Sequence, residues 1–240
     1  MKPIMFSILI LTLFSCCSVK LETTTVKLPP AIIPSATTAP LEDAECSSDF
    51  WNSMNPHYQN TVWPEVRLFS GTEDVVVRGD SIGFGAKPLP GFYGLQTKVY
   101  NVGANQICDM VRQAIAIRTT NPKSMVVWST GTNDLAHPLP RILKDVDILI
   151  FQAHQRWPNT HLVLVGVHKL GYGFSNSEST RQSLNSELKS RMQGNPMGCY
   201  VDPDEIVTSP ENQLFDGVHL KPETLWAMRA AILLQCHVSL

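Results

Sequence analysis

Residues 75–82 read Val-Val-Val-Arg-Gly-Asp-Ser-Ile, a β-branched apolar run that leads into the tripeptide Gly79-Asp80-Ser81. β-branched residues favour strands, and a short apolar run bounded by turn-forming residues is typical of a strand buried on both faces. The turn-prone pair Gly71-Thr72 precedes the run. The segment therefore predicts a buried strand that delivers a serine hydroxyl at its carboxyl end.

Four further short apolar runs follow along the chain, at residues 99–102, 125–128, 162–167 and 199–201. Between them, apolar residues recur with helical spacing, which predicts helices at about 107–115, 142–153, 178–193 and 222–233. Strands that alternate with helices form βαβ units, and continuous apolar strands suit a parallel sheet covered on both faces. The expected fold class is α/β, a three-layer α/β/α sandwich around a parallel sheet.

Polar motifs lie where three of these strands end and before the last helix. Besides Gly79-Asp80-Ser81, they are Asn101-Val102-Gly103, the segment 131–134 (Gly-Thr-Asn-Asp) and Asp216-Gly217-Val218-His219. Ligands of open parallel sheets bind at the carboxyl ends of the strands. Each motif alone also fits an ordinary turn, but all four in this order are rarely met by chance.

The residue types at these ends suit nucleophilic catalysis. A serine hydroxyl is a weak nucleophile and needs a base beside it. His219 is the candidate base, because Asp216 lies three residues earlier and can orient the ring. The other histidines lack such a motif and are expected to be surface or packing residues. For His168, which follows the fourth strand, the alternative is that it lines the cleft. The other histidines are His57, His137, His154, His161, His168 and His237.

Residues 70–236 resemble the SGNH hydrolase superfamily, also called the GDSL-like hydrolases, through these four motifs. The resemblance implies a flavodoxin-like sheet of order 2-1-3-4-5. It implies Ser81 as nucleophile, with His219 and Asp216 completing the triad. It also implies an oxyanion hole made by the backbone N–H groups of Ser81 and Gly103 and the side-chain amide of Asn133. Glycine leaves a backbone donor open to the substrate.

The N-terminal residues predict export. Lys2 and the apolar run of residues 4–14 suit a signal peptide over residues 1–18, the alternative being a buried helix. The run is too short for a membrane span, which needs roughly 20 residues. Residues 13–16 (Leu-Phe-Ser-Cys) resemble a lipobox, which implies lipidation of Cys16 and membrane anchoring without a spanning helix. The alternative is ordinary cleavage near Cys17.

A Thr/Pro-rich linker is expected over residues 19–46, and the hydrolase domain over residues 47–240. The predicted location is extracytoplasmic, either secreted or held at a membrane surface. Oxidising conditions favour disulfides, and the four remaining cysteines allow 3 pairings, among which the sequence does not choose. Free buried cysteines are the alternative. The four are Cys46, Cys108, Cys199 and Cys236.

Composition limits the ligand classes. The formal net charge is -2 and the chain has no basic run, so no nucleic-acid partner is predicted. The cysteines and histidines lack zinc spacing, and no phosphate-binding glycine loop is present, so neither a metal nor a cofactor is expected.

The predicted activity is that of a serine esterase acting on a small-molecule or glycan ester, such as O-deacetylation of a glycan or hydrolysis of a short-chain ester. The alternatives are a lysophospholipase, a thioesterase or an O-acyltransferase with the same triad. A non-catalytic glycan-binding module is the alternative from another class.

Overall fold

The computed structural model describes residues 74–86, 89–94, 96–101, 103–116, 121–238 and 240. The expected signal peptide (1–18), the lipidation site Cys16, the linker (19–46) and Cys46 lie outside the described residues. Among the helices of the described part, none has the length and apolar character needed to cross a membrane.

The described residues form one parallel sheet of five strands in the order β2-β1-β3-β4-β5, as the resemblance implied. Every neighbouring pair of strands is parallel. The strands lie close to the predicted apolar runs. Their bounds are β1 Val75–Gly79, β2 Thr97–Asn101, β3 Ser124–Trp128, β4 His161–Val165 and β5 Gly198–Val201.

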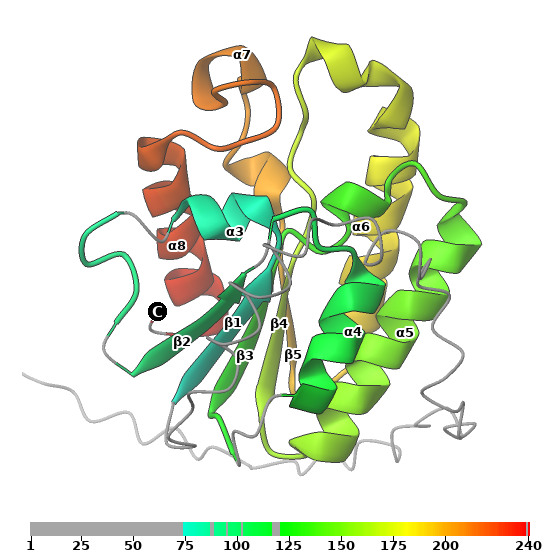
Figure 1. The fold of residues 1–240 in the computed structure, drawn as a ribbon, viewed down its shortest axis with the longest axis vertical. Helices are drawn as coiled ribbons and strands as arrows, with labels where there is room; N and C mark the ends of the chain where they lie inside the picture. The colour runs from blue at the N-terminus through cyan, green and yellow to red at the C-terminus, as the bar shows by residue number, and fades with distance from the viewer. Residues whose placement is uncertain (1–73, 87–88, 95, 102, 117–120, 239) are drawn as a thin grey trace, which may run out of the picture. The chain divides into compact units, whose positions relative to one another are not determined.

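The connecting helices lie on both faces of the sheet, which confirms the three-layer prediction (Figure 1). One face is covered by α4 (Ile107–Ala116), α5 (Leu139–Arg156) and α6 (Glu178–Gln193). The other face is covered by α3 (Ser81–Gly85) and α8 (Pro222–Cys236). Three 3-10 helices and a short α-helix complete the described part of the chain. They are η2 (Thr132–Asp134), η3 (Tyr172–Ser177), η4 (Pro203–Glu205) and α7 (Pro210–Gln213).

Strand β1 shows why the sheet is buried on both sides. Val76 packs into the core beneath α4, α5 and α6, whereas Val75 and Val77 pack beneath α3 and α8. Successive side chains of a strand point to opposite faces, so an unbroken apolar run fills both layers. Helix α5 ends at Arg156 before Pro158, because the residue before a proline is disfavoured in the helical region.

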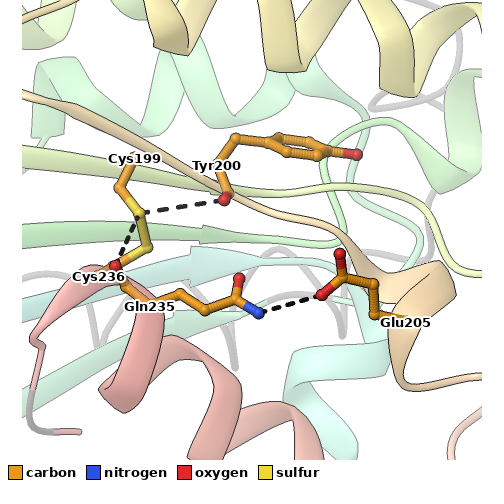
Figure 2. The surroundings of a disulfide bond; sticks show 5 residues. All are labelled: Cys199, Tyr200, Glu205, Gln235 and Cys236. Atoms are coloured by element: carbon orange, nitrogen blue, oxygen red, sulfur yellow. Dashed lines mark hydrogen bonds between the residues drawn. A yellow bond between two sulfur atoms is a disulfide. The ribbon is translucent and has the colours of Figure 1, made fainter.

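A disulfide joins the sheet to the last helix. Cys199 of β5 is bonded to Cys236, the last residue of α8, across a Cα–Cα distance of 5.8 Å (Figure 2). The bond closes a sequence separation of 37 residues. The sequence left the cysteine pairing open, and this bond is one of the pairs that it allowed. The bond also fixes the C-terminal end of α8, the helix that follows His219.

Candidate active site

Three adjacent strands deliver three of the four motifs to one edge of the sheet. The last residue of β1, Gly79, is in register with Asn101 at the end of β2 and with Trp128 at the end of β3. Ser81 follows β1 and begins α3, and Gly103 follows β2. Asn133 follows β3 and lies in η2. Because the strands are parallel and aligned, these residues share the carboxyl edge.

Ser81, His219 and Asp216 form a continuous hydrogen-bonded series. Ser81 Oγ lies 3.0 Å from His219 Nε2, and His219 Nδ1 lies 2.7 Å from Asp216 Oδ2. With the Nδ1–H donated to the carboxylate, Nε2 is the acceptor for the serine hydroxyl. Among the histidines of the described residues, His219 is the one that contacts Ser81. The arrangement is that of a nucleophile, its base and an orienting group.

The carboxylate of Asp216 has two roles in its loop. Oδ1 accepts the backbone N–H groups of Val218 at 3.0 Å and His219 at 2.8 Å, while Oδ2 holds the imidazole. The backbone N–H of His219, followed by its side chain, holds the pKa of Asp216 well below its ordinary value. Asp216 therefore stays ionised and can stabilise an imidazolium at His219.

The loop that carries Asp216 and His219 is closed by backbone contacts. Leu214 and Leu220 form an antiparallel bridge, and Phe215 N–H donates to His219 O at 2.8 Å. Gly217 has a φ of +85°, a left-handed conformation that favours glycine. Its carbonyl accepts the N–H of Gly171 at 2.7 Å, and a Cβ on Gly171 would lie only 2.7 Å from Gly217 Cα. Both positions therefore require glycine in this geometry.

Asn133 is held at the edge by two neighbours. Its Nδ2 donates to the carbonyl of Asn105 at 2.9 Å and lies 3.4 Å from Asp80 Oδ2. The first contact uses one amide hydrogen. The second hydrogen has only the long contact to Asp80, so it is the one that can turn to a developing oxyanion.

Asn105 supports this side of the site and was not singled out from the sequence. It is buried, and its Nδ2 donates to Gly79 O at 3.0 Å, so it links the end of β1 to Asn133. The sequence feature that could have identified Asn105 is its position two residues after Gly103, in the segment that follows a predicted strand. Gln106 adds a contact from its Nε2 to Asn133 O at 3.3 Å.

Two buried carboxyl groups shape the loops of the site. Asp80 Oδ1 accepts Ile82 N–H at 2.9 Å, and Asp134 Oδ2 accepts Ile107 N–H at 3.1 Å. Burial raises the pKa of Asp80 to about 8 and that of Asp134 to about 7. At pH 7 the folded protein therefore holds Asp80 mostly protonated and Asp134 about half protonated.

These raised pKa values predict a loss of stability at alkaline pH. An unfolded aspartate releases its proton near pH 4, whereas folded Asp80 and Asp134 release theirs only near pH 8 and pH 7. Their stabilising contribution is complete below about pH 4 and is lost as the pH rises through these folded values. Above about pH 6.5 unfolded histidines are largely neutral, so the aspartates dominate from pH 6.5 to 8.5. We expect the Tm to fall by about a few degrees over this range.

Asp134→Asn is the variant that checks this expectation. Asparagine keeps an oxygen for the Ile107 N–H and does not titrate. The Tm of Asp134→Asn, followed by circular dichroism, should fall less than that of the wild type between pH 6.5 and 8.5. If Tm falls equally with pH in the two proteins, Asp134 does not cause the loss of stability.

A hollow of about 320 Å³ lies beside the His219 ring, and its lining is almost wholly hydrocarbon. Its apolar lining includes Ile82, Leu89, Phe215, Leu220 and Leu225. Phe215 also lines a second, larger hollow of about 530 Å³ with Tyr172 and Glu211. Within the described residues, no three His, Cys, Asp or Glu side chains converge as metal ligands.

Comparison with known proteins places the fold. No family model matches the chain, and no curated protein matches it. Solved structures do match. A GDSL-like lipase from Bacteroides thetaiotaomicron aligns with a TM-score of 0.61 at 16% identity, covering 75% of this chain and 96% of the lipase. The chain has the SGNH hydrolase fold.

Two more proteins with the SGNH hydrolase fold extend the comparison. A member of the lipolytic G-D-S-L family from Veillonella parvula has a TM-score of 0.55 at 14% identity, covering 66% of this chain and 95% of its own. A catalytic mutant of an acetylxylan esterase from Geobacillus stearothermophilus has the same TM-score and identity, covering 70% and 95%. At these identities the likeness concerns the SGNH hydrolase fold alone.

Proposed function

We propose that this protein is a serine esterase that hydrolyses carboxylic esters with Ser81, His219 and Asp216. The observation that carries the proposal is the series Ser81 Oγ–His219 Nε2–Asp216 at 3.0 Å and 2.7 Å. Ser81 follows β1 at the carboxyl edge of the sheet, and the amide of Asn133 lies 3.4 Å from Asp80, the residue before Ser81, which supports the proposal. The solved structures of the same fold include a GDSL-like lipase and an acetylxylan esterase, which supports ester chemistry.

The proposed reaction has two steps. Ser81 Oγ attacks the ester carbonyl carbon while His219 Nε2 accepts the serine proton, and Asp216 stabilises the imidazolium. The carbonyl oxygen gains the negative charge and is met by the N–H groups of Ser81 and Gly103 and by the Asn133 amide. His219 then protonates the leaving alcohol oxygen, and the C–O bond breaks. In the second step His219 takes a proton from a water molecule, whose oxygen attacks the acyl carbon. The bond between this carbon and Ser81 Oγ then breaks, the acid leaves, and His219 returns the proton to Ser81 Oγ.

We propose a short acyl chain for the substrate, carried either by a glycan or by a small alcohol. The hydrocarbon-lined hollow beside His219 is large enough for more than an acetyl group, with a volume of about 320 Å³. Burying each methylene there is worth about 0.8 kcal/mol, which is about fourfold in kcat/KM. Phe215, whose side chain is exposed, forms an outer part of this lining.

The experiment that tests the proposed function is the hydrolysis of p-nitrophenyl acetate, butyrate and octanoate, with kcat/KM measured for each. We expect turnover, with kcat/KM about 4- to 16-fold higher for butyrate than for acetate. No turnover of any ester by the folded protein would contradict the proposal. Products formed on added sugar or alcohol acceptors would instead favour acyl transfer.

Phe215→Ala tests the acyl site within the same assay. Because this variant opens the hollow, the ratio of butyrate to acetate turnover should fall towards one. Tyr172→Ala is the matched control, since Tyr172 is an exposed aromatic residue that lines only the second hollow. An unchanged ratio in Phe215→Ala would place the acyl chain elsewhere.

A further inference from the structure

His168 links the interior of the protein to the loop that carries the catalytic base. It follows β4, is 1% exposed, and its Nε2 lies 2.7 Å from the carbonyl oxygen of Val218. A carbonyl only accepts, so Nε2 carries the hydrogen in this contact. Val218 immediately precedes His219, and 50 residues of sequence separate it from His168.

The backbone that presents His168 is itself held from helix α6. Asn185 Oδ1 accepts the N–H of Val167 at 2.9 Å, and Asn185 Nδ2 donates to the carbonyl of Val167 at 2.8 Å. Arg181 Nη1 also donates to that carbonyl at 2.8 Å. Three hydrogen bonds therefore fix the residue before His168, which makes the imidazole a rigid support.

Arg181 is in turn fixed by two carboxylates. Its guanidinium is fully buried and bonds Glu178 on its own helix at 2.7 Å and Asp204 of η4 at 2.8 Å. Charge-assisted bonds of this kind are stronger than neutral ones. The support for His168 thus extends through α6 to the segment that follows β5.

The two ends of the catalytic loop, Leu214 and Leu220, are buried in the core, but the catalytic side chains between them are restrained less by packing. The side chains of His219 and Asp216 are 41% and 56% exposed. The loop also has the bridge Leu214–Leu220, the Phe215–His219 and Gly171–Gly217 backbone bonds and the contact of His219 with Ser81. Within the described residues, His168 adds a hydrogen bond to the loop from a buried side chain. A shift of about 1 Å in a catalytic group can cost 10²-fold in rate.

The charge state of His168 suits this place. Burial, together with the charges of Arg181 and His219, lowers the pKa of His168 to about 4. The ring is therefore neutral at pH 7. It donates its hydrogen bond without adding a positive charge beside His219, which itself becomes positive during catalysis.

We propose that His168 is a positioning residue that holds the Val218 carbonyl and thereby aims His219 at Ser81. This inference rests on the proposed esterase function but concerns a residue that does not touch the reacting atoms. A role in packing alone predicts that the size of the side chain matters. A positioning role predicts that the N–H donor matters.

The test compares His168→Phe, which keeps an aromatic ring and loses the donor, with His168→Gln, whose Nε2–H₂ can reach the same carbonyl. We expect kcat on p-nitrophenyl butyrate to fall about 10- to 100-fold in His168→Phe with KM little changed. His168→Gln should recover most of the loss. Leu188→Ala, a core variant on α6 away from the site, controls for lowered stability and should keep the wild-type kcat well below its Tm.

Hydrogen exchange of residues 214–220 gives a readout that does not depend on activity. Amide exchange in this segment should be faster in His168→Phe and return towards the wild-type rate in His168→Gln. The proposal is overturned if His168→Phe keeps the wild-type kcat and exchange rates, or if His168→Gln loses as much as His168→Phe. If the wild type hydrolyses no ester, the proposed function fails, and the exchange data alone decide whether His168 holds the loop.

Discussion

Ser81→Ala is expected to lower kcat for p-nitrophenyl butyrate by about a millionfold, with binding of the ester little affected. Alanine removes the hydroxyl oxygen that lies 3.0 Å from His219 Nε2, the one nucleophilic atom that contacts this nitrogen in the part of the chain that the structure describes. His219→Ala should cost about as much, because serine without its base is a poor nucleophile. In serine hydrolases such residues act as a unit, so the double variant should lose little more than either single one.

Initial-rate kinetics, with active-site labelling by a fluorophosphonate probe, measure this effect. The probe should label the wild type and Ser190→Ala, a control on the exposed surface of α6, and should not label Ser81→Ala. Residual activity of Ser81→Ala above about a thousandth of the wild type would show that another group attacks the ester. Losses that simply multiply in the double variant would show that Ser81 and His219 act independently.

Asn133→Ala is expected to lower kcat by about 10²- to 10³-fold, with KM changed far less. The amide that donates to Asn105 O at 2.9 Å has one hydrogen left for the oxyanion, and alanine removes it when the charge develops. Asn133→Asp should lose at least as much, because a carboxylate cannot donate and repels the oxyanion.

Steady-state kinetics on the same ester, with thermal unfolding of each variant, check this prediction. Asn105 keeps its bond to Gly79 in these variants, so the Tm should change by only about a few degrees. A rise in KM with an unchanged kcat would mean that Asn133 binds the ground state and not the transition state.

The sheet and its four long helices could be predicted from the sequence because each carries a periodic apolar pattern. Helix α6, predicted at 178–193, spans Glu178–Gln193, and the strands differ from the predicted runs by a few residues at their ends. The short elements η2, η3, η4 and α7 were not predicted. A segment of three to six residues is too short to display a period.

The site divides in the same way. Ser81 and Asn133 lie in motifs at strand ends, and His219 lies in a motif before the last helix. Their residue types and positions therefore identify them as candidates in the sequence. The side chains of Asn105 and His168 donate to the backbone carbonyls of Gly79 and Val218, which are far away in the sequence, and no side-chain pattern marks such a partner. The buried Arg78 was also unexpected. It interrupts the apolar run of β1, and burial lowers its pKa to about 9.

The bond between Cys199 and Cys236 has a practical bearing on how the protein is made. A bacterial cytoplasm or a buffer with dithiothreitol keeps thiols reduced, so material from such a preparation lacks the tie between β5 and the end of α8. Helix α8 begins three residues after His219. Weak activity of such a preparation would then be explained by the missing disulfide and would not show that the ester tested is the wrong substrate. Production through an oxidising secretory route, with a count of free thiols, is therefore the sound starting point for every assay above.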